Sequence, residues 1–562
     1  MSVLVNESKK QIEKILIDAA NKAMSGGALC EAELAPFKVE VPSDRKNGDY
    51  AVNAAMVWAR GFKASPRAIA ETLMANADFE GTFIEKYEIA GPGFINFFLS
   101  DKYYANIIAD VIEKGEDYGK SNYGKNKRVL VEFVSANPTG PMHIGNARGG
   151  ALGDCLAAVL SAAGYYTERE FYINDAGNQI NKFGLSLSLR YQQLYSDGVE
   201  MPEDSYHGED IIAHAKAFAE INGDEYMSCD EQTRQKALVE FALPKNIQGL
   251  KDDLLKYRIE YNTWFKESDL HKSGETERII ELLKQSGHTY TQDGALWFKA
   301  TDFGCDKDFV LVRANGVPTY IVPDIAYHYN KLEVRKFDTA IDILGADHHG
   351  YVPRLKAALT ALGLDSDRIN AVLMQMVRLV RDGEVIKASK RSGKAITLVT
   401  LLDEVPIDAA RFFFNLREPN SHFDFDLDLA VSESNSNPVY YVQYAYARIC
   451  SILRNLADEG VARRDCTADE LSMLNAPEER ELIIHISALT DEIVLSAKAY
   501  DPARITHYVN ELATKFHKFY AACRVKGEDE SLTMARLNLC YATGIVIKNV
   551  LDMLKITAPE KM

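Results

Sequence analysis

The chain has 562 residues, too many for a single hydrophobic core, so we expect about three domains. Hydrophobic residues make up 47% of the chain and charged residues 26%, proportions that are typical of a soluble globular protein. The formal net charge of −17 gives the chain no overall attraction to nucleic acid. An RNA partner would therefore have to be held by a local basic face, through shape and base contacts.

The cysteines and the N-terminus bear on the cellular compartment. The 8 cysteines are scattered and include no Cys-x-x-Cys pair, which argues against a disulfide framework and against a structural zinc site. The first residues lack the basic and apolar segments of a secretion signal, and no later run is long enough to span a bilayer. We therefore expect a reduced, cytoplasmic protein that holds no zinc.

The first part of the chain, residues 1–115, has the pattern of a small α+β domain. Apolar residues recur at helical spacing over 8–24, and two adjacent glycines then end the helix. Residues 37–41 alternate like a half-buried strand, and 94–99 predict another strand after a Gly-Pro-Gly turn. Composition alone favours an accessory domain without chemistry of its own. A polar, lysine-dotted stretch at 115–127 then predicts a linker.

Residues 129–164 predict the unit around which the next domain is organised. The β-branched run 129–134 is typical of a buried parallel strand, a turn with proline and glycine follows, and a helix then runs to the end of the unit. Such a unit places a helix N-terminus at the carboxyl edge of a sheet, where backbone N–H groups favour phosphate. Gly145 would let the backbone approach a nucleotide closely, and His143 would donate to a phosphoryl oxygen. Taken alone, a histidine at a helix start is more often a cap or a core residue.

The next stretch predicts a strand, a helical insertion and further strands. Residues 167–173 form the strand, which ends in a cluster of polar side chains. From 182 to 287 the chain is rich in charged, helix-forming residues, which predicts a mostly helical insertion. Within it, 261–268 is best explained as a packed aromatic helix. The parallel sheet is then expected to resume at 295–298 and 309–313.

Two polar segments lie beyond the next strand, 341–344. The run 347–349 (Asp-His-His) contains good metal ligands, but adjacent histidines on an extended loop point in opposite directions and no third ligand lies at helical spacing. We therefore expect no metal site there. A hairpin at 382–384 precedes a run of lysine, serine and arginine residues, which predicts a mobile cationic loop at 387–394.

The C-terminal part predicts a connector followed by a helical bundle. Residues 401–436 form the connector, Pro438 opens a helix, and helical periodicity continues through 437–562. Near the start of the bundle, four side chains combine aromatic rings with polar groups: Tyr441, Gln443, Tyr444 and Arg448. Such a composition can stack on unpaired bases, although aromatic residues at helical spacing are more often core residues.

Two short motifs resemble the signatures of class I aminoacyl-tRNA synthetases. His143-Ile144-Gly145-Asn146 resembles their HIGH signature, and Lys387-Ala388-Ser389-Lys390-Arg391 resembles their KMSKS loop. Asn146, Ala388 and Arg391 depart from the family pattern, but Asn can still donate a hydrogen bond and Arg keeps a cation near phosphate. The resemblance implies catalytic roles for His143, Asn146, Lys387 and Lys390. It implies ATP contacts for Gly140, His143, Gly145, Asn146, Ser389 and Lys390.

The chain also resembles, more narrowly, the arginyl-tRNA synthetases. The resemblance rests on residues 47–51, 90–96, 437–445 and 558–562 and on the spacing of Tyr320 and Asp324. It implies that Tyr320 and Asp324 face the guanidinium of arginine, which needs a carboxylate of matching geometry. Further contacts to the amino acid are implied for Glu132, Asn137 and His348; pairing of Glu132 with a neighbouring cation is the alternative. The implied tRNA contacts are the elbow, through residues 1–115, and the side chains Tyr441, Gln443, Tyr444 and Arg448.

We therefore predict a multidomain α/β protein. A Rossmann-like parallel-sheet catalytic domain at 122–400 carries the helical insertion. It lies between the N-terminal α+β domain and an all-α anticodon-binding bundle. The implied substrates are L-arginine, ATP with Mg²⁺, and tRNA-Arg, with tRNA bound before arginine is activated and the 2′-hydroxyl acylated first. We expect a monomer without a resident metal ion or a membrane partner.

Three alternatives remain open at this point. The first is a class I synthetase for another amino acid, such as glutamine. The second is a small-molecule adenylyl- or cytidylyltransferase that shares the His-x-Gly fold, but such an enzyme would not need the long helical C-terminus. The third is a synthetase-like tRNA-binding or regulatory protein without catalysis. Intact His143, Gly145, Lys387 and Lys390 argue against this last alternative.

Overall fold

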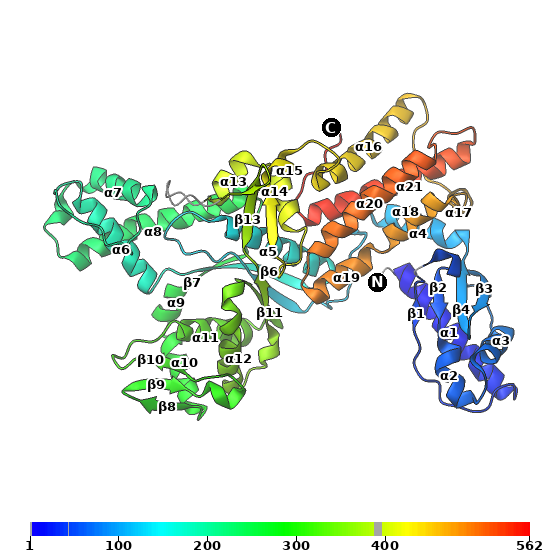
Figure 1. The fold of residues 1–562 in the computed structure, drawn as a ribbon, viewed down its shortest axis with the longest axis horizontal. Coiled ribbons are helices and arrows are strands. Elements are labelled where there is room, and N and C mark those ends of the chain that lie inside the picture. Colours follow the sequence, from blue (N-terminus) through cyan, green and yellow to red (C-terminus); the bar gives the residue numbers. More distant parts are fainter. Residues whose placement is uncertain (1–2, 43, 387–395) are drawn as a thin grey trace.

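The computed structural model describes residues 3–42, 44–386 and 396–562. Figure 1 shows the N-terminal domain (blue) at one end of the molecule, beneath a bundle of C-terminal helices (orange to red). The central sheet lies in the middle, and three helices of residues 178–256 extend from it to the opposite end. Among the described residues, no helix is both long and apolar enough to cross a membrane.

The N-terminal domain packs helices on a four-stranded antiparallel sheet with the order β1-β2-β4-β3. Its elements are α1 (Val3–Ser25), β1 (Val39–Glu40), β2 (Tyr50–Val52), α2 (Ala54–Phe62), α3 (Pro66–Asn76), β3 (Ile84–Ala90), β4 (Phe94–Leu99) and α4 (Asp101–Lys114). The predicted helix at 8–24 and the predicted strand at 94–99 are confirmed. The strand predicted at 37–41 is only two residues long. Pro42, which lacks an N–H for the ladder, follows it closely.

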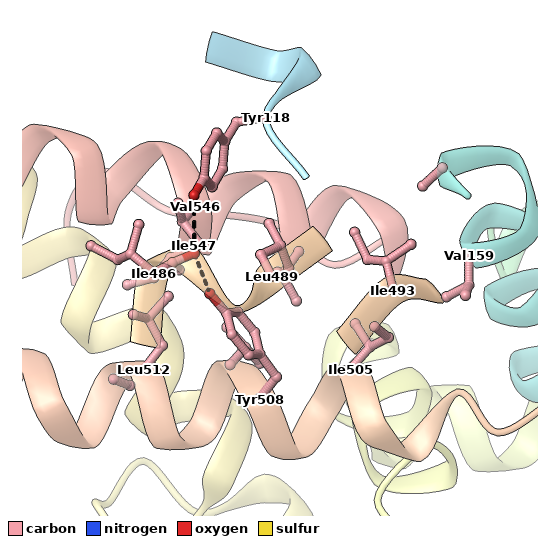
Figure 2. Packing of buried hydrophobic residues seen from close by; sticks show 14 of the residues in the cluster. Tyr118, Val159, Ile486, Leu489, Ile493, Ile505, Tyr508, Leu512, Val546 and Ile547 are labelled. Carbon is pink, nitrogen blue, oxygen red and sulfur yellow. Dashed lines mark hydrogen bonds between the residues drawn. The ribbon is translucent and has the colours of Figure 1, made fainter. Parts of the chain in front are cut away.

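The stretch predicted as a linker, 115–127, is docked against the C-terminal bundle. Tyr118 is buried, and its hydroxyl donates to the carbonyl of Ile486 at 3.2 Å. The same carbonyl also accepts a hydrogen bond from the hydroxyl of Tyr508 (Figure 2). From the last helix, the Asn549 amide donates to the carbonyls of Gly115 and Tyr118. Because these contacts satisfy its backbone and bury an aromatic ring, the first residues of the predicted linker form a structured joint with the bundle.

The central sheet has five parallel strands in the order β12-β11-β5-β6-β7. The elements are β5 (Arg128–Glu132), α5 (Ile144–Ala162), β6 (Tyr166–Ile173), β7 (Thr263–Lys266), α9 (Glu267–Lys272), α10 (Glu275–Gln285), α11 (Ile321–Tyr329), β11 (Thr339–Gly345), α12 (Val352–Ala361) and β12 (Ile369–Met374). The strand, turn and helix predicted for 129–164 are thus present as β5 and α5. Gly153 lets α5 pack closely against Phe133, the residue after β5, because a Cβ at position 153 would lie 2.2 Å from the Phe133 ring.

Two predictions about this sheet are wrong. Residues 261–268 were expected to be helical, but they contain β7, whose Trp264 stacks on Phe171 of β6 at 4.5 Å. The Thr-Trp-Phe sequence has a strong strand preference, which is satisfied once a neighbouring strand is available. The strands at 295–298 and 309–313 also do not continue the parallel sheet.

Those strands form a separate three-stranded antiparallel sheet with the order β10-β9-β8. Its elements are β8 (Thr289–Gln292), β9 (Ala295–Phe298) and β10 (Phe309–Val312). Only Asp293 and Gly294 connect β8 to β9, and a turn that short permits an antiparallel hairpin but not the crossover that parallel strands require.

The helices that project from the central sheet have their own core. They are α6 (Asn178–Gln192), α7 (Glu209–Asn222) and α8 (Glu231–Lys256). Phe183, Leu187, Tyr191, Phe218 and Leu238 are buried among them as a cluster separate from the main core. The range predicted as a helical insertion, 182–287, therefore contains these helices but also includes β7, a strand of the central sheet.

After the central sheet come a connector and the C-terminal bundle. The connector contains β13 (Val377–Arg381), β14 (Glu384–Val385), α13 (Leu398–Glu404), α14 (Ile407–Phe414), β15 (Phe423–Asp426) and α15 (Leu427–Val431). The bundle contains α16 (Pro438–Asp458), α17 (Ala468–Leu471), α18 (Pro477–Ser487), α19 (Leu489–Ala499), α20 (Ala503–Ala522) and α21 (Glu530–Met553). Asn437 caps α16 at the predicted start of the bundle. The predicted multidomain α/β fold with an all-helical C-terminus is confirmed.

A buried arginine joins the connector to α5 and to the end of the bundle. The Arg411 side chain is fully buried and donates from Nη2 to Asp154 Oδ2 at 2.5 Å. Its other nitrogens donate to the carbonyl of Leu554 at 2.7 Å and that of Tyr257 at 3.0 Å. Since Asp154 lies on α5, this single guanidinium holds together three parts of the chain.

We expect Arg411→Met to destabilise the fold strongly. The substitution leaves one oxygen of buried Asp154 and two carbonyls without their donor, at a cost of about 3 kcal/mol or more. The midpoint of urea unfolding, followed by intrinsic fluorescence, should fall clearly. The control is Lys284→Met, which removes an exposed pair with Glu281 and should change stability by about 1 kcal/mol or less. Equal midpoints for the two variants would contradict the structural role of Arg411.

Candidate active site

A cavity of about 1300 Å³ lies at the carboxyl edge of the central sheet. Glu132 at the end of β5 and Asn174 just after β6 line it on the side of the sheet, and α9 and α11 contribute the opposite wall. Four residues predicted to contact the amino acid line this cavity: Glu132, Tyr320, Asp324 and His348. The structure thus gathers residues that are 216 positions apart in the sequence, Glu132 and His348, at one site.

Asp324 is the carboxylate that α11 presents to the cavity. Its Oδ2 accepts a hydrogen bond from the hydroxyl of Tyr351, and its Oδ1 lies 3.1 Å from Nδ1 of His328. Burial alone would raise the pKa of Asp324, but the charge and hydrogen bond of His328 and the bond from Tyr351 lower it. Tyr320 stands at the start of α11, 70% exposed, with its ring stacked on that of Tyr351.

Behind Asp324 lies a buried network of charged groups. Nε2 of His328 is 2.8 Å from Oδ2 of Asp342, and Nζ of Lys331 is 2.8 Å from Oδ1 of the same carboxylate. Lys331 also lies 2.6 Å from Oε2 of Glu132. The network therefore runs without interruption from Asp324 to Glu132, and Glu132 does pair with a neighbouring cation, as one of the two sequence-based interpretations held.

His328, Lys331 and Asp342 were not among the site residues predicted from the sequence. A signal was present, because Asp324, His328 and Lys331 have the spacing i, i+4 and i+7, which places them on one face of a helix. Lys331 lies where α11 continues as a π-helical segment, Asn330–Val334, a feature frequent at functional sites. The contribution of Asp342 depends on the pairing of β11 with β5, which the sequence does not show.

The electrostatics of the network favour the charged forms of Asp324, His328, Lys331 and Asp342, whereas burial favours the neutral form of Glu132. Burial and the nearby Lys331 would lower the pKa of His328, but Asp324 and Asp342 raise it to about 10. Burial would raise the pKa of Asp342, but Lys331 and His328 hold it well below its usual range. Burial raises the pKa of Glu132 despite the opposing effect of Lys331. Two ionised carboxylates, Asp324 and Asp342, therefore face two cations, and the network carries one net negative charge only in the form in which Glu132 is ionised as well.

This network does not fit a resident metal ion. Glu132, His328 and Asp342 each direct a possible ligand atom to a common point, and these atoms lie within 4.8 Å of one another. However, the ammonium of Lys331 is already within hydrogen-bond distance of both carboxylates. A metal cation among these groups would be repelled by Lys331 and by protonated His328.

The HIGN turn lies outside the lining of this cavity, at the start of α5. Asn146 accepts a hydrogen bond from the backbone N–H of His143 at 3.0 Å, so its side-chain oxygen caps the helix. The His143 residue is exposed. Among the described residues, an added Cβ on Gly145 would meet no atom within 4 Å. On Gly140, an added Cβ would meet one described neighbour, the carboxylate of Asp210, at 3.8 Å.

The lysine-rich signature falls on residues that the structure does not describe. Lys387, Ser389 and Lys390 lie outside the described residues. The residues that follow are described, and they contact the HIGN turn. Thr397 pairs with His143, and the carbonyl of Ile396 accepts a hydrogen bond from the backbone N–H of Ile144 at 3.2 Å. The chain that leaves the second signature therefore meets the first.

The remaining predicted contacts lie apart from the cavity. The side chain of Asn137 donates to that of Gln179 at 3.1 Å, and Gln179 in turn lines the cavity. In the bundle, the Arg448 guanidinium donates to the Tyr444 hydroxyl at 2.7 Å, and the Tyr441 ring lies 4.8 Å from that of His517. These side chains are half-buried and form a polar, aromatic surface on α16 and α20.

Gln443 differs from its neighbours in the bundle. Its amide donates to Asp408 Oδ2 at 2.9 Å and to the carbonyl of Thr557 at 2.8 Å. Asp408 also pairs with Arg258 at the end of the insertion. Gln443 therefore contributes to a joint between α16, the connector and the C-terminal segment, and its predicted contact with RNA remains a prediction.

Comparison with known proteins places this site in a family. The family model for the arginyl tRNA synthetase N terminal domain matches residues 7–99. That for the catalytic domain of tRNA synthetases class I (R) matches 107–426, and that for the DALR anticodon binding domain matches 442–562. The parallel sheet, the HIGN turn at its edge and the matched catalytic model define a class I aminoacyl-tRNA synthetase.

The chain belongs to the arginyl-tRNA synthetase family. It is 51% identical to the arginine–tRNA ligase of Acetivibrio thermocellus and 52% identical to that of Caldanaerobacter subterraneus subsp. tengcongensis, in both cases over 100% of each chain. It has the fold of the arginyl-tRNA synthetase of Thermus thermophilus, with a TM-score of 0.74 and 22% identity over 99% of this chain and 100% of that chain.

We expect His328 to make stability depend on pH. Its pKa is raised from 6.5 to about 10 in the fold, so its protonation stabilises the fold fully below pH 6.5, and this contribution is lost as the pH rises through about 10. The thermal midpoint should therefore fall between pH 7 and 10 more steeply in the unaltered protein than in His328→Gln. Parallel pH dependences would contradict the charged state of His328.

Proposed function

We propose that the chain is an arginine–tRNA ligase. It binds L-arginine in the cavity, activates it with ATP to arginyl-adenylate, and transfers the arginyl group to the 3′-terminal adenosine of tRNA-Arg. The observation that carries this proposal is the buried network at the cavity, which combines three carboxylates with two cations and presents Asp324 to the ligand. Membership of the arginyl-tRNA synthetase family favours this function over a synthetase for glutamine and over a small-molecule nucleotidyltransferase.

The guanidinium of arginine would lie in the cavity, against the carboxylates that the network presents there, Asp324 and Glu132. It is planar, always charged, and donates in a fork that a carboxylate matches. In our proposal Asp324 accepts from this fork, with Tyr320 beside it and Glu132 facing the same cavity. Asn137 and His348 bind the amino-acid end, where the Asn137 side-chain oxygen suits the ammonium group.

Activation needs stabilisation of charge on phosphate. As the carboxylate of arginine attacks the α-phosphate, pyrophosphate leaves and negative charge develops on the transferring group. The N-terminus of α5, with His143, the backbone at Gly145 and the remaining amide N–H groups of Asn146, offers donors suited to this group. We assign the second cationic contribution to Lys387 and Lys390. No side chain becomes covalently attached, so catalysis rests on positioning and electrostatics.

Mg²⁺ belongs with ATP in this proposal. Such an ion is usually bound through phosphate oxygens and one or two carboxylates, rather than by a closed set of protein ligands. When bound, it supplies positive charge to the triphosphate. The protein groups that we assign to the phosphates are His143, Asn146, Lys387 and Lys390.

The other domains are assigned to tRNA. The aromatic and arginine side chains on α16 and α20, Tyr441, Tyr444 and Arg448, combine ring faces with a fixed cation, which suits stacking on unpaired anticodon bases. The N-terminal domain is assigned to the tRNA elbow. We propose a monomer that works in the cytoplasm.

The function is tested by ATP–pyrophosphate exchange. We expect exchange that depends on arginine and requires total tRNA, with none for a panel of the other amino acids. Exchange with a different amino acid would overturn the assignment of Tyr320 and Asp324. Absence of exchange with every amino acid, in the presence of tRNA, would favour a non-catalytic tRNA-binding protein.

Asp324→Asn tests the assignment of the pocket. Losing a charged partner of the guanidinium should raise the KM for arginine by about 30-fold or more, because truncating a buried charged pair costs about 2 kcal/mol or more. The KM for ATP should change by about twofold at most, since this side chain is assigned no contact with ATP. Asp302→Asn, outside the cavity lining, is the control. Equal losses for arginine and ATP would refute the assignment.

A further inference from the structure

We propose that Lys331 and His328 are positioning residues for the amino-acid pocket, which hold Glu132 and Asp324 at fixed places in the cavity wall through their shared partner Asp342. This inference rests on the proposed binding of arginine at Asp324. Neither residue is proposed to react with the substrate. They act through the two carboxylates that face the cavity.

Lys331 fixes the first carboxylate. Its side chain is completely buried, and its ammonium lies 2.6 Å from Glu132 and 2.8 Å from Asp342, with the ring of Tyr327 4.1 Å from the nitrogen. Ser135 donates to the other oxygen of Glu132 at 2.8 Å. Both oxygens of Glu132 thus have a partner on the protein, which sets the orientation of this carboxylate before any ligand arrives.

His328 fixes the second carboxylate. One ring nitrogen lies 3.1 Å from Asp324 and the other 2.8 Å from Asp342, so the imidazole bridges a cavity carboxylate and a buried one. Tyr351 donates to the remaining oxygen of Asp324. The ring nitrogen next to the Asp324 carboxylate also lies 2.9 Å from the backbone carbonyl of Asp324, so the imidazole contacts both the main chain and the carboxylate of this residue, and its positive charge favours the ionised carboxylate.

Asp342 connects the two halves. Its Oδ1 accepts from Lys331 and its Oδ2 accepts from His328, and the residue is only 4% exposed. The strand that carries it, β11, pairs directly with β5, which carries Glu132. One buried carboxylate therefore sets the positions of both cations relative to the sheet edge.

A purely structural role would not require this arrangement. Buried ion pairs contribute little net stability, and apolar side chains of similar size often serve as well or better. Here the network includes two groups that line the cavity, Glu132 and Asp324, and its helix carries a π-helical segment at Lys331. A fixed pair of carboxylates binds a planar cation with less loss of side-chain freedom.

The test compares three variants with a matched control in full-length protein. Asp342→Asn is nearly isosteric and keeps one oxygen but places an NH₂ group against one of the two cations. His328→Gln and Lys331→Met remove each cation in turn. The control is Arg335→Met, which removes the cation 2.6 Å from Glu170, a fully buried carboxylate, at the end of the same helical segment but outside the cavity lining.

Kinetic constants are measured by arginine-dependent pyrophosphate exchange with saturating tRNA-Arg, and folding is checked by thermal unfolding. We expect the KM for arginine to rise at least about tenfold in Asp342→Asn and His328→Gln, with the KM for ATP and kcat within about threefold of the unaltered enzyme. Lys331→Met should likewise raise the KM for arginine while leaving the KM for ATP and kcat within about threefold. Arg335→Met should keep the KM for arginine, even where it lowers the thermal midpoint.

Each outcome decides the proposal. An unchanged KM for arginine in folded Asp342→Asn overturns it, as does a parallel rise of both KM values or an equal effect of Arg335→Met. Where His328→Gln or Lys331→Met does not fold, the isosteric Asp342→Asn decides alone. Failure of the underlying assignment gives a different pattern, in which Asp324→Asn itself leaves the KM for arginine unchanged.

Discussion

The buried pairing of Lys331 with Glu132 and Asp342 is the constraint on which the cavity depends. Removing these charges from water is costly, and the attraction among them offsets that cost only where the geometry is good. Their separations of 2.6 and 2.8 Å meet this condition. The pairing fixes the distance between α11 and the edge formed by β5 and β11. The orientation of every side chain on α11 that faces the cavity follows from it.

The helix that carries the HIGN turn is fixed in a comparable way. Its N-terminus is held by the pairing of His143 with Thr397, and its second half is held through Asp154 by Arg411 and by Arg169. Val159, farther along the same helix, is buried in one core with Ile493 and Ile505 of the bundle (Figure 2). The helix whose N-terminus carries the HIGN turn is thus packed, through its second half, directly against the C-terminal bundle.

How much of this was visible in the sequence depends on how local each feature is. The strand and helix around 129–164 were predictable because their periodicity and turn lie in one stretch. The edge strand β7 was not, since its aromatic residues suit a packed helix as well as a strand until β6 is known to lie beside it. Tyr320, Asp324 and Glu132 were found through motif resemblance. Asp342 and Lys331 were not predicted, because they lie 11 residues apart in the chain and meet only in the fold. Their contact with Glu132 depends further on the pairing of β11 with β5.

A cavity wall that presents the carboxylate of Asp324 has a consequence for specificity. A ligand without a cationic group would displace water from Asp324 but would not replace the hydrogen bonds that water makes to this carboxylate. The resulting free-energy cost exceeds the loss of a single favourable contact. Sites built on buried polar partners reject analogues that lack those partners far more strongly than apolar pockets reject a missing methylene. For such a site the discrimination is made at binding, and it relies on the carboxylates staying where they are. Lys331 and His328, with Asp342 between them, provide that rigidity. They lie where β5, the strand that leads into the HIGN turn, meets the helical segment that continues α11, through Glu132.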